Sequence, residues 1–173
     1  MCRRVGCRDI ARRSARAGRR CACRPLYGLP VARETVVVWM PGGVRTEIHL
    51  SSQDTGGAFC LLLDEPPVGW SLPAHRHSSE AETIHIVEGE FVVEINGEVS
   101  RLSAGETVHV RKGEIHSSTN IGAVPGRRVV VFSPAGMERF FLEAGVPKAD
   151  SEIDLGGALA SAVRHGWEFL PEV

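Results

Sequence analysis

Three histidines and one glutamate in this chain have the residue types and spacing of a metal site: His75, His77, Glu82 and His116. Imidazole nitrogens and a carboxylate oxygen are donors that first-row transition metals accept in proteins. His75 and His77 are two residues apart, so on a β-strand both side chains project from the same face. Glu82 follows a short polar turn, and His116 comes from a separate predicted strand. A sheet folded over a cavity would bring these four donors together.

Glycines at fixed distances make this pattern more specific than the four donors alone. Residues 69–89 read G-x5-H-x-H-x4-E-x6-G, and residues 105–120 read G-x5-R-x-G-x2-H-x3-N. Together they resemble the two sequence motifs of the cupin superfamily. Every fixed position of the first motif matches. In the second motif Arg111 stands where the family usually has proline, which alters a turn before the last donor but removes no donor atom.

The resemblance implies an all-β fold, a double-stranded β-helix (jelly-roll) barrel that holds one divalent transition metal. The metal ligands it implies are His75, His77, Glu82 and His116. The metal can be Fe, Mn, Ni, Co, Cu or Zn, because these donors suit all six and the sequence does not choose among them. Glu80 is an alternative carboxylate, but it would leave eight residues before the motif glycine instead of six. We therefore expect Glu80 at the solvated rim of the site.

The composition fits one globular domain built mainly from strands. The chain has 173 residues, of which 43% are hydrophobic, and its 19 glycines and 10 prolines lie largely between short apolar runs. We expect a barrel over residues 31–135 with about ten short strands. A hairpin is predicted at Asn96-Gly97, and residues 82–87 and 91–95 are expected to be neighbouring strands. Alternation from Glu82 places His85 on the opposite face of its strand. The longest apolar runs are too short to span a membrane.

The C-terminal segment, residues 136–173, has a helical pattern and is expected to pack on the barrel. Four residues have the spacing of one helix face, and Gly145 and Pro147 after them are signals for the end of a helix: Met137, Phe140, Phe141 and Ala144. A second helix is predicted for residues 152–164, and three residues form its apolar face: Leu155, Leu159 and Val163. A more specific hypothesis is that Met137, Phe140 and Phe141 cover the barrel opening and exclude water.

The N-terminal segment differs in charge from the rest of the chain. Residues 1–24 contain nine arginines and one acidic residue, whereas the remainder has 11 basic and 20 acidic residues. We interpret residues 1–30 as a disordered arginine-rich arm, or as sequence translated from upstream of the true start codon, since the arginines follow no aromatic or helical pattern. The alternative is a targeting or nucleic-acid-binding extension. A nucleic-acid partner is not expected.

Cysteine placement indicates a reducing compartment, and hence a cytoplasmic protein. Four of the five cysteines lie in the arginine-rich arm, without the paired C-x2-C spacing of a zinc module: Cys2, Cys7, Cys21 and Cys23. The fifth, Cys60, lies in an apolar run and is interpreted as a small buried hydrophobic residue.

Residues 129–141 (VVVFSPAGMERFF) resemble the segment after the second motif in single-domain, quercetin 2,3-dioxygenase-like cupins. This resemblance implies a dioxygenase-type oxidoreductase in which the metal orients a small chelating organic substrate beside dioxygen. Glu82 would then be the catalytic base as well as a ligand. The alternatives are a non-redox cupin, namely a sugar or keto-acid isomerase or lyase, and a non-enzymatic small-molecule-binding cupin. The family also implies a homodimer.

Overall fold

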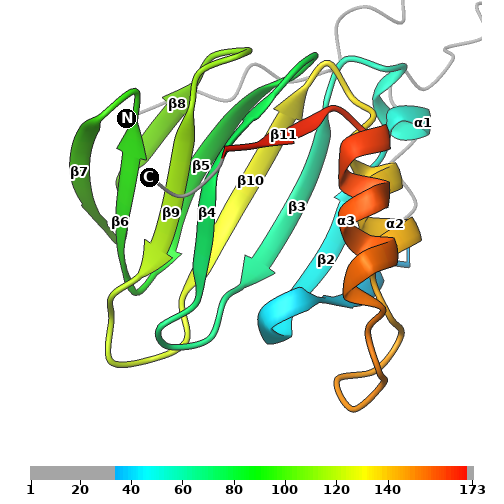
Figure 1. Cartoon of the computed structure of the whole chain (residues 1–173), viewed down its shortest axis with the longest axis horizontal. Coiled ribbons are helices and arrows are strands. Elements are labelled where there is room, and N and C mark those ends of the chain that lie inside the picture. Colours follow the sequence, from blue (N-terminus) through cyan, green and yellow to red (C-terminus); the bar gives the residue numbers. More distant parts are fainter. Residues whose placement is uncertain (1–33, 171–173) are drawn as a thin grey trace, which may run out of the picture. The chain divides into compact units, whose positions relative to one another are not determined.

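The structure, a computed structural model, describes residues 34–170 and consists of two antiparallel sheets that face each other (Figure 1). The six-stranded sheet has the order β1 (Val36–Met40), β2 (Val44–Leu50), β3 (Cys60–Glu65), β10 (Arg127–Ser133), β5 (Ala81–Glu88) and β8 (Thr107–Val110). The five-stranded sheet has the order β11 (Trp167–Phe169), β4 (Ser71–His77), β9 (His116–Asn120), β6 (Glu90–Ile95) and β7 (Glu98–Ser103). This arrangement confirms the predicted all-β, double-stranded β-helix.

Four short helical segments complete the described chain: η1 (Pro41–Gly43), α1 (Ser52–Thr55), α2 (Glu138–Ala144) and α3 (Leu155–Arg164). Figure 1 shows α2 and α3 beside β2 and β3, on the side of the molecule away from β6 and β7. No helix within residues 34–170 has the length and apolarity that a membrane span requires. The arginine-rich arm, with its four cysteines, lies outside the described residues.

Buried and exposed side chains alternate along the strands with a period of two residues, so one face of each strand packs into the core. On β5 and β10 every second residue faces the space between the sheets: Glu82, Ile84, Ile86, Arg128, Val130 and Phe132. The hairpin between β6 and β7 is formed as predicted, since Asn96 (φ 51°) and Gly97 (φ 88°) have the positive φ values of a type I′ turn. Cys60 is a buried free thiol, and burial raises its pKa to about 11.

The expected pairing of residues 82–87 with residues 91–95 is wrong. β5 pairs with β10 and β8, whereas β6 pairs with β7 and β9, so the chain crosses from one sheet to the other between them. Gly89 makes this crossing with a φ of 93°, a conformation that glycine adopts without steric cost. Sequence proximity indicated a hairpin here, but the two strands belong to opposite layers.

The C-terminal segment contains both predicted helices, but the predicted apolar face of α3 is wrong. Leu155, Leu159 and Val163 are 66%, 55% and 60% exposed. The buried residues of α3 are small ones: Ala158, Ser161 and Ala162. Small side chains let the helix axis approach the barrel closely, while the exposed Leu155 and Leu159 line a cavity that Glu82 also lines. After α3, the segment continues into a strand, β11, that the sequence analysis did not predict.

We predict that Gly126→Ala lowers the free energy of unfolding by about 1–3 kcal/mol, as overpacking does. A Cβ at this position would lie 2.3 Å from Phe91 Cζ, and Phe91 is fully buried in a small core with Ile84 and Ile86. Gly156→Ala is the matched control. It lies on the exposed side of α3 with no contact closer than 3.5 Å, so it should raise stability by about 0.4–1 kcal/mol. Urea unfolding measures both, and an unchanged midpoint for Gly126→Ala would contradict the packing.

Candidate metal centre

The four predicted donors converge in the space between the two sheets. β4 contributes His75 and His77, β9 contributes His116, and β5 of the opposite sheet contributes Glu82. His75 lies directly across from His116 in the β4–β9 pair. One donor atom from each of the four residues lies within 4.8 Å of all the others, and all four side chains are buried. The structure therefore brings together the complete predicted set.

Glu82 connects the histidines of the opposite sheet. Its Oε2 atom lies 3.1 Å from His77 Nε2 and 2.9 Å from His116 Nε2. The other ring nitrogen of His116, Nδ1, lies 3.1 Å from the carbonyl oxygen of Glu114, and His75 Nδ1 lies 2.8 Å from that of Pro73. A carbonyl can only accept, so both Nδ1 atoms carry hydrogen. This fixes Nε2 of both rings as the atom available to a metal.

The donor atoms are incompletely satisfied without a cation. His75 Nε2 is buried and has no hydrogen-bond partner. With Nδ1 protonated, a neutral His116 presents a lone pair to the carboxylate of Glu82, and only a second proton or a cation makes that contact favourable. Buried polar atoms are almost always paired in native structures. The chemistry of this donor set and its unpaired nitrogen fit one divalent transition metal.

Burial and mutual contacts shift the pKa values at this centre in different directions. Burial opposes the charged form of Glu82, but hydrogen bonds with His116 and His77 outweigh it and hold the pKa of this carboxyl well below its usual range. Burial likewise opposes a charged His116, and its contact with Glu82 outweighs burial and raises its pKa. Burial, followed by the nearby His116, lowers the pKa of His75 to about 3. His75 is therefore neutral and ready to bind a cation.

Aromatic rings enclose the histidines, and the nearest of them was missed by the sequence analysis. Trp167 stacks on His75, with ring centroids 4.6 Å apart and an interplanar angle of 15°, and it meets His77 edge-on at 4.6 Å. Its position follows from β11, which pairs with β4 so that Trp167 lies opposite His77. The signal was the apolar–polar–apolar triplet after Gly166, which is too short to identify a strand by alternation.

A cavity of about 220 Å³ adjoins the centre and is lined mostly by apolar side chains. Glu82 lines it, together with six aromatic residues: Trp70, Phe132, Phe140, Phe141, Trp167 and Phe169. Phe140 and Phe141 thus lie beside the centre, and the hypothesis that they cover the barrel opening stays a prediction. Met137 instead packs in the core, where its Sδ atom accepts a hydrogen bond from Trp167 Nε1.

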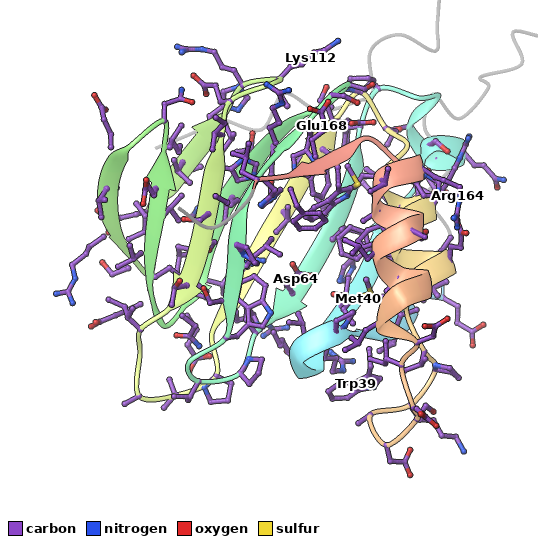
Figure 2. The ribbon with its side chains drawn as sticks, in the orientation of Figure 1. Trp39, Met40, Asp64, Lys112, Arg164 and Glu168 are labelled. Atoms are coloured by element: carbon purple, nitrogen blue, oxygen red, sulfur yellow. The ribbon has the colours of Figure 1, made fainter. Side chains whose placement is uncertain are left out.

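Two buried charges in the same cavity were also missed. Asp64 and Arg128 form an ion pair of 3.2 Å, and both line the cavity beside the apolar residues. Figure 2 labels Asp64 in the middle of the barrel. Their sequence signal was a charge at an inward position of an otherwise apolar strand, since Asp64 ends CLLLD and Arg128 starts RVVVF.

The remaining candidate residues lie outside the four-donor cluster. His85 is on the outer face of β5, where its Nδ1 atom lies 2.8 Å from Thr107 Oγ1, as alternation predicted. Glu80 lies at the rim, but it is less solvated than predicted. Its Oε2 atom is buried without a hydrogen-bond partner, and burial raises the pKa of this carboxyl.

Comparison with known proteins agrees with this architecture. Residues 62–132 match the family model described as a cupin domain, a range that includes all four donors. The chain contains a cupin domain. Among curated proteins, it is 33% identical over 93 residues to the tetracenomycin polyketide synthase protein TcmJ of Streptomyces glaucescens. It is 28% identical over 108 residues to a quercetin 2,3-dioxygenase of Bacillus subtilis.

These matches cover only part of each protein. The TcmJ match covers 54% of this chain and 62% of TcmJ, and the dioxygenase match covers 62% of this chain and 32% of the dioxygenase. Among solved structures, this cupin resembles a predicted oxalate decarboxylase of Thermotoga maritima, with a TM-score of 0.53 and 26% identity. That match covers 60% of this chain and 98% of the decarboxylase chain.

We predict that the purified protein binds one divalent metal per chain and that His116→Ala lowers its metal affinity by more than about 100-fold. Loss of a residue that only hydrogen-bonds to a metal ligand lowers metal affinity roughly 10–100-fold. His116→Ala removes a ligand atom itself, so its effect should be larger. His85→Ala is the matched control, because it removes a histidine from the outer face of β5. Elemental analysis after purification without an affinity-metal step measures the content, and circular dichroism checks folding. Equal metal in folded samples of both variants would refute the assignment.

Proposed function

We propose that this cupin is a metal-dependent, dioxygenase-type oxidoreductase that acts on a small chelating organic substrate. The metal is bound by His75, His77, Glu82 and His116. The observation that carries the proposal is that the four-donor cluster adjoins a largely apolar cavity, and that Glu82 belongs to both. An apolar cavity with a few convergent polar groups is the usual form of a small-molecule site.

The residues of the chain have separate roles in this proposal. A bound divalent metal would supply Lewis acidity, which lowers the pKa of a hydroxyl group that it binds. Glu82 is the base that accepts the proton of a substrate hydroxyl, since it is the carboxylate of the four-donor cluster and also lines the cavity. Phe132 and Trp167 contact His77 and line the cavity, where they form an apolar wall for a flat substrate ring. Phe140 lines the same cavity and excludes water from the reacting atoms.

One relative supports an oxidative reaction, because it is named as a quercetin 2,3-dioxygenase. The other is named as a polyketide synthase protein, and that name states no reaction. The substrate class that we propose is a compound with neighbouring oxygen atoms, because such atoms can chelate a metal. The partial coverage of both relatives leaves the identity of the substrate to experiment.

A non-redox lyase is the second candidate, and one comparison favours it. The Thermotoga maritima structure is described as a predicted oxalate decarboxylase and shares the fold at 26% identity. A decarboxylase would release carbon dioxide from a small acid without consuming dioxygen. A purely ligand-binding cupin would do neither, but its melting temperature would rise with ligand. Oxygen uptake therefore separates the first proposal from both others.

We predict that metal-loaded protein consumes dioxygen with a catechol substrate, and that Glu82→Gln lowers the rate per bound metal by about 10²–10⁴-fold. The amide keeps the shape of the side chain but cannot accept the proton. Glu88→Gln, at the exposed end of the same strand, is the matched control. An oxygen electrode and elemental analysis of the same samples give the rate and the metal content. Product formation without oxygen uptake would favour the lyase.

We also propose that the protein is a homodimer, as the cupin resemblance implies, and that it is cytoplasmic, as its cysteine placement indicates. Multi-angle light scattering of the full chain is expected to give twice the mass of 18.7 kDa. The measurement is made with reductant present, because the full chain has four further cysteines besides the buried Cys60: Cys2, Cys7, Cys21 and Cys23. A single species with the mass of one chain would reject the dimer.

A further inference from the structure

Arg128 is a buried charge whose contacts do not use all of its donors. Its side chain lies on the inner face of β10 with 4% exposure. Nη2 donates to Asp64 Oδ2 at 3.2 Å, and Nη1 donates to Ser118 Oγ at 3.1 Å. The guanidinium lies 4.7 Å from the centroid of the Trp70 ring. The Nε–H group is buried and has no hydrogen-bond partner.

The unpaired Nε–H group of Arg128 lowers the stability of the fold, so its presence calls for a reason other than packing. Leaving one donor unsatisfied costs about 1–3 kcal/mol, and buried polar groups in native proteins are nearly always paired. A buried ion pair is itself weak support for stability, because desolvation offsets much of the attraction. Arg128 and Asp64 both line the 220 Å³ cavity, and so does the Trp70 ring beneath the guanidinium. Packing alone therefore does not account for a charged group with a free donor at this place.

The spacing of the strands relates Arg128 to the metal centre. Ser118, which accepts from Arg128, and His116, which belongs to the four-donor cluster, both face inward on β9 and are two residues apart. Two residues of a strand span about 7 Å, roughly the length of a substituted aromatic ring. A flat molecule that chelates at the histidines thus extends along the strand toward the guanidinium.

We propose that Arg128 is a substrate-binding residue that donates a hydrogen bond to a carbonyl or carboxylate oxygen on the far side of the ring from the chelating oxygens. This inference rests on the proposed function and adds a substrate class to it. The ligand is a planar compound of one or two rings, because the cavity is smaller than the roughly 300–1,000 Å³ of drug-sized sites. Arg128 then sets specificity and does not take part in the chemistry.

Asp64 has a positioning role in this arrangement. It accepts from Arg128 and, at 2.7 Å, from Thr46 Oγ1, so the carboxylate is held on two sides. A guanidinium fixed in this way loses little conformational freedom when a ligand binds. Its charge is also balanced in the absence of ligand, which makes burial between the sheets tolerable.

Isothermal titration with three catechols tests the proposal on the metal-loaded full chain. The probes are 3,4-dihydroxybenzoate, 3,4-dihydroxyacetophenone and 4-ethylcatechol, which share the chelating hydroxyls but carry an anionic acceptor, a neutral acceptor or none. We expect at least one acceptor-bearing probe to bind about tenfold or more tighter than 4-ethylcatechol, as one hydrogen bond to a charged donor provides. The affinities of the benzoate and the acetophenone, compared with each other, show whether Arg128 prefers a charged or a neutral acceptor oxygen.

Arg128→Met should reduce this preference to about twofold or less. Since that change leaves Asp64 buried without its partner, the double variant Arg128→Met/Asp64→Leu removes both charges and provides the same test in a folded protein. Arg127→Met is the matched control, because the neighbouring arginine is exposed and pairs with Glu65 at 3.6 Å on the outer face. It should keep the full preference.

Two results would overturn the role of Arg128. One is equal affinity of the wild type for all three probes, and the other is a preference that survives in the variants lacking Arg128. Neither result affects metal content or oxygen uptake, which test the proposed function. Conversely, absence of bound metal and of oxygen uptake would contradict the proposed function, whereas equal probe affinities in a sample that does bind metal would contradict the role of Arg128 alone.

Discussion

The contact of Glu82 with two histidines ties the two sheets of the barrel together at one point. Glu82 is the member of the cluster that comes from the six-stranded sheet, whereas His75, His77 and His116 belong to the five-stranded sheet. The cluster therefore exists only when the two layers lie at the right distance and register. A one-residue slip of β5 against β10 would turn Glu82 outward and replace it with Thr83 or Ala81. A bound cation would reinforce the same closure, because binding to the folded state alone stabilises it.

Polar groups inside the barrel are gathered on the side of the metal centre and the adjoining cavity. A small apolar core of Ile84, Ile86 and Phe91 borders these groups, since the Arg128 guanidinium lies 5.8 Å from the centroid of the Phe91 ring. On the cavity side lie the four donors, the Asp64–Arg128 pair, and two of the buried atoms without partners, His75 Nε2 and Arg128 Nε. Such groups lower stability unless a ligand satisfies them. Their concentration around one cavity indicates a surface shaped for binding at the expense of packing.

The sequence predicted what depends on short distances along the chain. The histidine pair on β4, the outward His85 and the Asn96–Gly97 turn follow from strand alternation and turn conformation, which are local properties. The crossing at Gly89 and the face of α3 depend on which layers meet. Leu155, Leu159 and Val163 have the spacing of a buried stripe, but close contact through Ala158 and Ala162 decides otherwise. Arg128 was missed because the sequence does not show that this charge pairs with Asp64 or lines a cavity.

The C-terminal strand shows why the cupin motifs alone do not describe the complete site. β11 is three residues long and pairs with β4 at the positions of His75 and His77, and it places Trp167 against both rings. So short a strand has little stability of its own and depends on this pairing and on the packing of Trp167 with Met137 and Phe140. Any interaction that orders the histidines of β4 therefore also favours docking of β11, and the reverse holds by thermodynamic linkage. A metal bound by His75 and His77 would in this way also stabilise the pairing of β11 with β4.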